Sequence, residues 1–417
     1  MAAMATWFLI VIYLAFISLG LPDSLLGAAW PVMRPDLGAP LEAAGMLAMI
    51  VAGGTIVSSL ASGRLIDKLG TGPITLISCL MTAAALLGFS FAPSLLWFAL
   101  LAIPLGLGAG AVDAALNHYV ATHYEAHHMS WLHCFWGVGA TGGPLLISYF
   151  IKEHDSWRAG YTAVAIIQVA LVTILLATLP LWKKVAAQRS MLRASSRPHH
   201  SDASVKGSNK FTAKTDREED IRPSAQPMRL PGVKMSMLAF LFYCGVETLV
   251  GLWGASFLVG ARGIPAETAA WWISLYYGGI TIGRLITGFI TLKVSNRILI
   301  LVGPLISALG AVLLLLPLPG AITLAGFVLI GFGFAPVYPG LIHETPVRFG
   351  RANSAKLIGY QMAVAYTGTT FLPPLFGLLA SQAGIGLFPV VSLLLIVLML
   401  LCSEYVNRAI KRKYLIA

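Results

Sequence analysis

Long apolar stretches alternate with short polar segments along this chain, and their spacing predicts membrane-spanning helices. The stretches lie near residues 6–33, 43–62, 73–92, 94–122, 129–151 and 159–182, and after a polar interruption near 235–260, 268–292, 298–317, 320–342, 357–380 and 383–407. An apolar helix needs about 20 residues to cross a hydrocarbon core, and these stretches are long enough. The pattern therefore predicts an all-α membrane protein with twelve spans in two groups of six.

The polar interruption divides the chain. It is rich in charged residues, Ser, Pro and Gly and holds little apolar content, so it cannot bury a core of its own. We therefore expect a six-helix bundle at residues 1–182, a cytoplasmic linker at 183–232 and a second six-helix bundle at 233–417.

Composition and charge agree with a membrane location. Hydrophobic residues make up 57% of the chain and charged residues 11%, outside the range of soluble globular proteins. If the N-terminus is cytoplasmic, 23 Lys and Arg residues fall on the inner side and four on the outer side. This bias predicts that both termini are cytoplasmic in a plasma membrane, which we take to be a bacterial inner membrane. The net charge of +11 is then a topology signal and predicts no nucleic-acid partner.

An internal repeat relates the two groups of spans. Residues 23–27 read DSLLG and residues 247–251 read ETLVG, while residues 63–66 and 283–286 both read GRLI. Two six-helix halves of the same topology form a transporter architecture in which the substrate binds near the bilayer midplane between the halves. The repeat therefore predicts a secondary transporter with alternating access.

A loop motif adds a family resemblance. The stretch SGRLIDKLGTG, residues 62–72, resembles the G-x-x-x-D-[RK]-x-G signature of the major facilitator superfamily. The resemblance implies that fold and a gating role for the motif, with close helix approach at its first Gly and an acid that faces partners in one conformation only. The second half keeps the Gly and Arg but has Thr and Gly in place of the acid and base. The candidate gating residues are Gly63, Arg64, Asp67, Lys68, Gly70, Gly283 and Arg284.

Three acidic residues lie deep within apolar spans: Asp23, Asp113 and Glu247. Insertion scales put the cost of a charged group at the bilayer centre at ~2.5 kcal/mol or more, so such residues face the protein interior and have a use. Burial disfavours the charged form of a carboxyl group, so these acids can carry protons. We interpret them as proton-coupling residues; the alternative is an interhelical hydrogen bond that only fixes packing.

Neighbouring polar and aromatic residues predict a cargo site. Asn117 follows Asp113 by four residues, so both lie on one helix face, and His133 and Trp136 occupy the next span. A carboxamide, an imidazole and an indole could bind hydroxyl groups and stack on a sugar ring. The further candidates from the second half are Trp253, Tyr276, Tyr277 and Gln361, and for the aromatic residues packing against lipid or neighbouring helices is the alternative.

The same acids carry a closer resemblance. DAALNHY, residues 113–119, resembles the E-T-A-A-N-P-Y stretch of the fucose/galactose/glucose proton symporter family, and LPDSLL resembles its L-N-D-I-L motif. The resemblance implies proton coupling and sugar recognition by Asp23 and Asp113. This chain departs from that family with Asp for Glu at 113, His for Pro at 118 and Pro for Asn at 22. Related animal members are sodium-dependent, so sodium stays an alternative coupling ion.

We therefore expect a monomeric proton-coupled symporter of a small neutral solute, a sugar or polyol, whose partners are that substrate and the lipid bilayer. The alternatives are an exporter of cationic drugs or metabolites and a sodium-coupled sugar transporter. Arg284 is the single Lys or Arg deep in a span, and this scarcity argues against an anionic cargo. The sequence holds no pairing of nucleophile and base, no metal-ligand set and no phosphate-binding loop, so we expect no enzyme activity, no metal and no cofactor.

Overall fold

The computed structural model describes residues 2–123, 126–195, 226–291 and 293–416, and within them every regular element is a helix. The elements of the first half are α1 (Ala2–Asp23), α2 (Leu25–Asp36), α3 (Ala43–Leu69), α4 (Thr71–Ser90), α5 (Leu95–His123), α6 (Ala126–His154) and α7 (Trp157–Ser195). Those of the second half are η1 (Pro227–Arg229), α8 (Val233–Arg262), α9 (Ala266–Ile290), α10 (Asn296–Leu315), α11 (Gly320–Phe334), α12 (Val337–Phe349), α13 (Arg351–Ala383), η2 (Ile385–Leu387) and α14 (Phe388–Ile416).

Twelve helical stretches of the described chain are long and apolar enough to cross a membrane, which confirms the predicted fold class. The first span joins α1 to α2, and the tenth joins α11 to α12. The predicted linker falls mostly outside the described residues. Helix α7 continues to Ser195, beyond its membrane span, which ends at Trp182.

The first span is interrupted at the acid that the sequence singled out. Pro22 has no amide hydrogen, so the carbonyl of Ser18, one turn earlier, loses its helical partner. The side-chain amide of Gln168 on α7 donates to that carbonyl over 2.6 Å. A freed backbone group within a membrane span must find such a partner inside the protein. The break leaves Asp23 as the last residue of α1, with Ser24 between the two helices.

The helices form two bundles with the same internal pairing. In the first half α1 packs on α6, α3 on α5 and α4 on α7; in the second half α8 packs on α13, α9 on α11 and α10 on α14. Glycines allow close approach at these crossings. Gly139 on α6 lies against the backbone of Ile17, and Gly368 on α13 lies against the backbone of Leu241. Small residues at helix crossings are the usual way to bring membrane helices into close contact.

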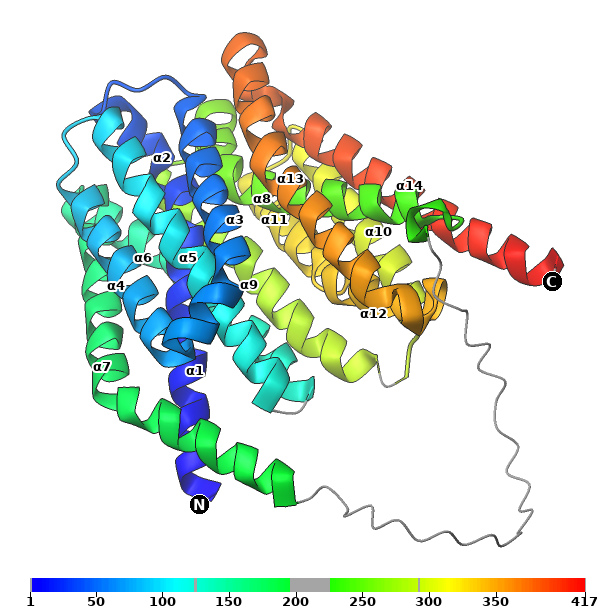
Figure 1. Ribbon diagram of the computed structural model, residues 1–417. Coiled ribbons are helices and arrows are strands. Elements are labelled where there is room, and N and C mark those ends of the chain that lie inside the picture. The colour runs from blue at the N-terminus through cyan, green and yellow to red at the C-terminus, as the bar shows by residue number, and fades with distance from the viewer. Residues whose placement is uncertain (1, 124–125, 196–225, 292, 417) are drawn as a thin grey trace, which may run out of the picture.

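The two halves meet at one end of the molecule, which we call the closed end; it contains the connection from α2 to α3 at the top of Figure 1. Gly27 on α2 touches the backbone of its repeat partner Gly251 on α8. Near the same end the hydroxyl of Ser148 on α6 donates to the carbonyl of Glu267 on α9 over 2.7 Å. Helix α3 also packs against α13.

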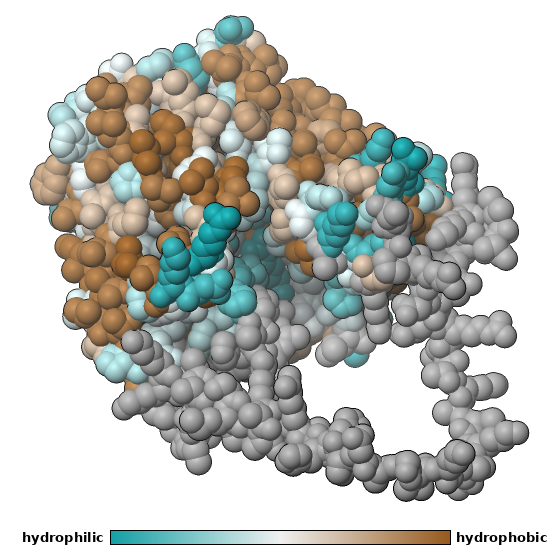
Figure 2. All heavy atoms as spheres, in the orientation of Figure 1, coloured by the Kyte–Doolittle hydropathy of each residue, from teal (hydrophilic) through white to brown (hydrophobic). Residues whose placement is uncertain are grey.

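The halves diverge toward the opposite end, which we call the linker end because α7 leaves the first bundle and α8 enters the second there (Figure 1). Figure 2 shows hydrophobic residues over the flanks of both halves and hydrophilic residues around a recess between them. The structure therefore has a central cavity that is open at the linker end.

Candidate functional site

Asp23 lies in the middle of the first span, yet its side chain is exposed. Its Oδ2 atom accepts a hydrogen bond of 2.8 Å from the indole Nε1 of Trp136 on α6. The guanidinium of Arg284 on α9, in the other half, lies over the Trp136 ring, with its Cζ atom 5.3 Å from the ring centroid. Because residues of both halves surround Asp23, its exposure is to the space between the halves rather than to lipid. The first predicted acid therefore faces the central cavity.

Arg284 also binds the second-half acid. Its Nη2 atom lies 3.3 Å from Oε1 of Glu247 on α8, and 15% of each side chain is exposed. Burial removes the water that would otherwise solvate both charged groups, so such an ion pair is stable only when its geometry is good. Asp23, Trp136, Arg284 and Glu247 thus form a continuous chain of contacts from one half to the other, which we call the cross-half chain.

Asp113 and Asn117 lie one turn apart on α5, as predicted. The Asn117 amide donates to Asp113 Oδ1 and to the Asp113 carbonyl, both over 2.9 Å. Both side chains are half-buried. His133 on α6 is also half-buried, and the ring of Phe16 meets it edge-on at 5.9 Å between centroids. The hydrogen bond from Asn117 and the edge contact with Phe16 hold these polar side chains in place within the first half.

Three predicted cargo residues are buried away from the cavity: Trp253, Gln361 and Tyr276. Trp253 has no exposed surface; its indole donates to the carbonyl of Pro373 over 2.8 Å, and its ring packs against Phe376. Gln361 is 1% exposed. Its Oε1 accepts from Thr345 over 3.0 Å, and its Nε2 donates to Ser236 over 2.9 Å. Their polar atoms are satisfied by the helices around them, which favours the packing alternative for Trp253 and gives Gln361 a structural role.

The adjacent tyrosines of α9 behave differently from each other. Tyr276 is fully buried, and its hydroxyl donates to the backbone carbonyl of Glu247 over 3.0 Å. Tyr277 is 7% exposed and meets the ring of Trp136 edge-on, with centroids 6.4 Å apart. Tyr277 therefore extends the aromatic surface of the cross-half chain, whereas Tyr276 fixes α9 against α8.

The first-half gating motif lies at the linker end. Arg64, Asp67 and Lys68 are exposed, and none of them has an ion pair among the described residues. Gly70 has a φ of +83° and connects α3 to α4, a conformation that favours glycine. The expected close helix approach at Gly63 is absent in this conformation, because a Cβ atom there would meet nothing within 4 Å.

The second-half copy of the motif has different surroundings from the first. Gly283 does pack closely, against Ala335 and the backbone of Phe332 at the α11–α12 junction. Arg284, which we expected to be a gating residue, belongs to the cavity because it pairs with Glu247 at depth. One signal in the sequence could have identified this pair: a lone arginine within a span requires an acidic or carbonyl partner, and Glu247 is the acid of the adjacent span.

The arrangement suits a polar solute held between the two halves. The cross-half chain combines two carboxylates, one guanidinium and an indole, from helices α1, α6, α8 and α9. Among the described residues, no group of three His, Cys, Asp or Glu side chains lies close enough to hold a metal ion. The chemistry available at the site is therefore hydrogen bonding, ion pairing, aromatic contact and proton binding.

Known proteins match this chain over most of its length. A family model described as Major Facilitator Superfamily matches residues 12–212 and 235–413. A cis,cis-muconate transport protein of Acinetobacter baylyi is 26% identical over 385 residues, which cover 90% of this chain and 87% of that protein.

Solved structures share the fold. The crystal structure of a D-xylose–proton symporter superposes with a TM-score of 0.68 at 16% identity, covering 93% of this chain and 96% of the other. The inward open conformation of the xylose transporter XylE from E. coli gives a TM-score of 0.73 at 12% identity, covering 97% and 96%. At these identities the likeness establishes the twelve-helix architecture alone.

Proposed function

Because the chain belongs to the Major Facilitator Superfamily, and so is a secondary transporter of the membrane rather than an enzyme, we propose that it is a proton-coupled symporter of a small neutral solute, a sugar or polyol. The transporting unit is a monomer that alternates between a state open at the linker end and one open at the closed end. The linker end faces the cytoplasm of a bacterium, in accord with its excess of Lys and Arg.

The observation that carries this proposal is the carboxylate of Asp23, which lies mid-span, is exposed to the cavity and is linked through Trp136 and Arg284 to Glu247 of the other half. Transporters of this architecture bind cargo near the midplane between their halves. A chain of contacts between the halves at that depth can respond both to a proton and to a bound solute.

The proposed roles follow from these contacts. Asp23 and Asp113 bind and release the coupling proton. Glu247 takes part in proton coupling only when another anion replaces it at Arg284. Asn117, His133, Trp136 and Tyr277 contact the solute. A proton that moves inward down the membrane potential releases ~2.3 kcal/mol per 100 mV, which is sufficient to concentrate a neutral solute. Sodium is the alternative coupling ion. The motif from Gly63 to Gly70 and the close packing of Gly283 serve the conformational change.

The test is uptake into sealed proteoliposomes. Labelled hexoses and polyols are offered under an imposed inward proton gradient and then under a sodium gradient. We expect accumulation with the proton gradient, and loss of accumulation in Asp23→Asn. Glu153→Gln is the matched control, because this acid is exposed at the end of α6 and removing its charge leaves the cavity unchanged. Absence of sugar uptake under both gradients would refute the sugar proposal.

A small carboxylate is the second candidate cargo, and the observation that favours it is the position of Arg284 in the cavity. If Glu247 is protonated, the guanidinium becomes available to a carboxylate of the cargo, and proton and anion then enter together. The relative in Acinetobacter baylyi is named as a transporter of cis,cis-muconate, a dicarboxylate. The sequence alone argued against anionic cargo, but one well-placed arginine is enough to bind a carboxylate.

Charge movement distinguishes the two candidates. A sugar that enters with one proton carries positive charge inward, whereas a monocarboxylate with one proton carries none and a dicarboxylate with one proton carries negative charge inward. Transport currents on a solid-supported membrane, recorded beside labelled uptake, therefore separate them. Sugar-induced inward current supports the first proposal; electroneutral uptake of a monocarboxylate that Arg284→Gln abolishes supports the second.

A further inference from the structure

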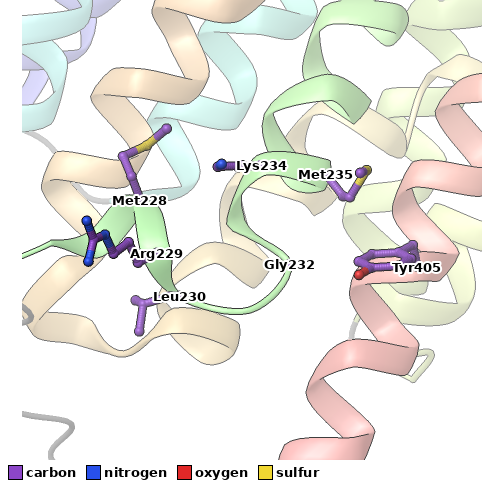
Figure 3. Close-up of a pocket in the computed structure, with 7 residues that line it drawn as sticks. All are labelled: Met228, Arg229, Leu230, Gly232, Lys234, Met235 and Tyr405. Carbon is purple, nitrogen blue, oxygen red and sulfur yellow. The ribbon is translucent and has the colours of Figure 1, made fainter.

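A second hollow lies outside the transport site, at the linker end of the second half. It has a volume of about 350 Å³ and forms where η1, the first turn of α8 and the last part of α14 meet. We call it the η1 pocket. Figure 3 shows Met228, Arg229 and Lys234 on one side of the pocket and Met235 with Tyr405 on the other. Its lining residues are Met228, Arg229, Leu230, Gly232, Lys234, Met235 and Tyr405.

The η1 pocket carries positive charge that no described side chain neutralises. Arg229 and Lys234 are both exposed, and neither has an ion pair among the described residues. The nearest acid in the sequence of α14, Glu404, is already bound by Arg408 and Asn407. Helix α8 has no acidic residue in its first turn and no side-chain cap. The pocket is therefore complementary to an anion.

The pocket also lies at the membrane boundary. The seventh span begins at Val233 and the twelfth ends at Lys411, so the lining residues sit at the ends of their spans. Tyr405 is more than half exposed, and a tyrosine at this depth is typical of the interface between water and hydrocarbon. The site is thus reached from the lipid headgroup region.

An exposed apolar stripe leads from the pocket toward the bilayer centre. Leu394, Val397, Leu401 and Tyr405 are all exposed and recur every three or four residues, so they lie on one face of α14. An acyl chain can lie along this face while its headgroup stays at the cations.

We propose that the η1 pocket binds an anionic phospholipid of the cytoplasmic leaflet, with the phosphate group between Arg229 and Lys234 and an acyl chain along the exposed face of α14. Basic pockets between membrane helices on the cytoplasmic side are suited to such headgroups. Free phosphate would use the same two cations but gains nothing from Met228, Met235 or the α14 stripe. The bound lipid joins η1 and the start of α8 to α14, where the linker enters the second bundle.

The proposal is tested by native mass spectrometry of the purified full chain titrated with phosphatidylglycerol or with phosphatidylcholine of the same acyl chains. We expect preferential binding of phosphatidylglycerol. Each Lys or Arg near an anionic lipid contributes about fivefold to affinity, so Arg229→Gln with Lys234→Gln weakens binding about 25-fold. The matched control is Lys293→Gln with Arg297→Gln, which removes two exposed cations from the same end of the molecule, outside the pocket.

Three outcomes overturn the proposal. The first is equal binding of the two lipids by the wild type. The second is unchanged phosphatidylglycerol binding in the double variant. The third is displacement of the lipid by inorganic phosphate, or binding of glycerol phosphate as tight as that of the lipid, which would identify a soluble anion as the ligand. The single variant Lys234→Gln changes one exposed side chain and gives an independent measure, with about fivefold weakening expected if the double variant does not fold.

Discussion

Gly27 is the position where one added methyl group should prevent the halves from meeting. In this structure a Cβ atom on Gly27 would touch the carbonyl of Gly251 and would lie 2.7 Å from Cα and 2.9 Å from the carbonyl oxygen of Leu252. These are backbone atoms, which cannot rotate away. Carbon atoms in contact prefer about 3.5 to 4.0 Å, so Gly27→Ala forces α2 and α8 apart by about 1 Å.

Two contributions to the free energy change at this position, and only the first of them shifts the balance between the conformations. Overpacking of this kind destabilises the contact by about 1–3 kcal/mol. Alanine in place of glycine within a helix returns about 0.5–1 kcal/mol in either conformation, so it does not change the balance between them. Since 1.4 kcal/mol is a factor of ten, we expect Gly27→Ala to lower the ratio of closed to separated halves at this end by about 5- to 150-fold.

Gly53→Ala is the matched control, because Gly53 is also a glycine inside a helix, α3, but has nothing within 4 Å of its Cβ position in this structure. The assay is the distance distribution between spin labels at Lys152 on α6 and Ser381 on α13, which lie on different halves near the closed end. We expect a longer distance to gain population in Gly27→Ala and no change in Gly53→Ala. A distribution in Gly27→Ala equal to that of the wild type would refute the argument.

Two further predictions concern stability. Glu247 and Arg284 form a buried pair, so replacing either one alone by glutamine or methionine should destabilise the protein by about 3 kcal/mol or more. The variant with both replaced should have a stability within about 1 kcal/mol of the wild type. Thermal unfolding in detergent measures both stabilities, and additive effects of the two single substitutions would contradict the pairing. Gln361→Ala leaves the buried hydroxyl of Ser236 without its partner, while Thr345 keeps the carbonyl of Leu341 as its acceptor. The substitution should cost about 1–3 kcal/mol of stability with an unchanged KM for the cargo; a raised KM at normal stability would restore Gln361 to the cargo site.

The fold was accessible from the sequence because a membrane span must be both apolar and about 20 residues long. The predicted seventh and eighth spans, for example, differ from α8 and α9 by two residues at each end. The interruption of the first span was not predicted, although Pro22 is visible in the sequence. Whether a proline bends or breaks a membrane helix depends on which neighbour satisfies the freed carbonyl, and here that neighbour is Gln168, far away along the chain.

The site was predicted less completely, because hydropathy does not define how a membrane helix is rotated about its axis. Lipid-facing and protein-facing sides are both apolar, so Trp253 and Gln361 were plausible cavity residues until their partners on neighbouring helices became visible. Arg284 shows a different limit of the sequence: the internal repeat aligned it with Arg64, but the two arginines have different surroundings. Arg64 is exposed at the linker end, whereas Arg284 is bound to an acid at depth.

Asp23 and Glu247 occupy equivalent places in the repeat, but their partners differ, and this difference bears on which acid carries the proton. A proton on Asp23 removes a charge next to an indole N–H, which has no charge of its own to leave unpaired. A proton on Glu247 leaves the guanidinium of Arg284 buried without its counter-ion, which is unfavourable by several kcal/mol. With a neutral cargo we therefore expect Asp23 to carry the coupling proton while the ion pair stays closed. With a carboxylate cargo, the anion itself can replace Glu247 at the guanidinium, so Glu247 becomes the acid that is free to take the proton. The effect of Glu247→Gln on coupling, measured beside that of Asp23→Asn, thus also reports the charge of the cargo.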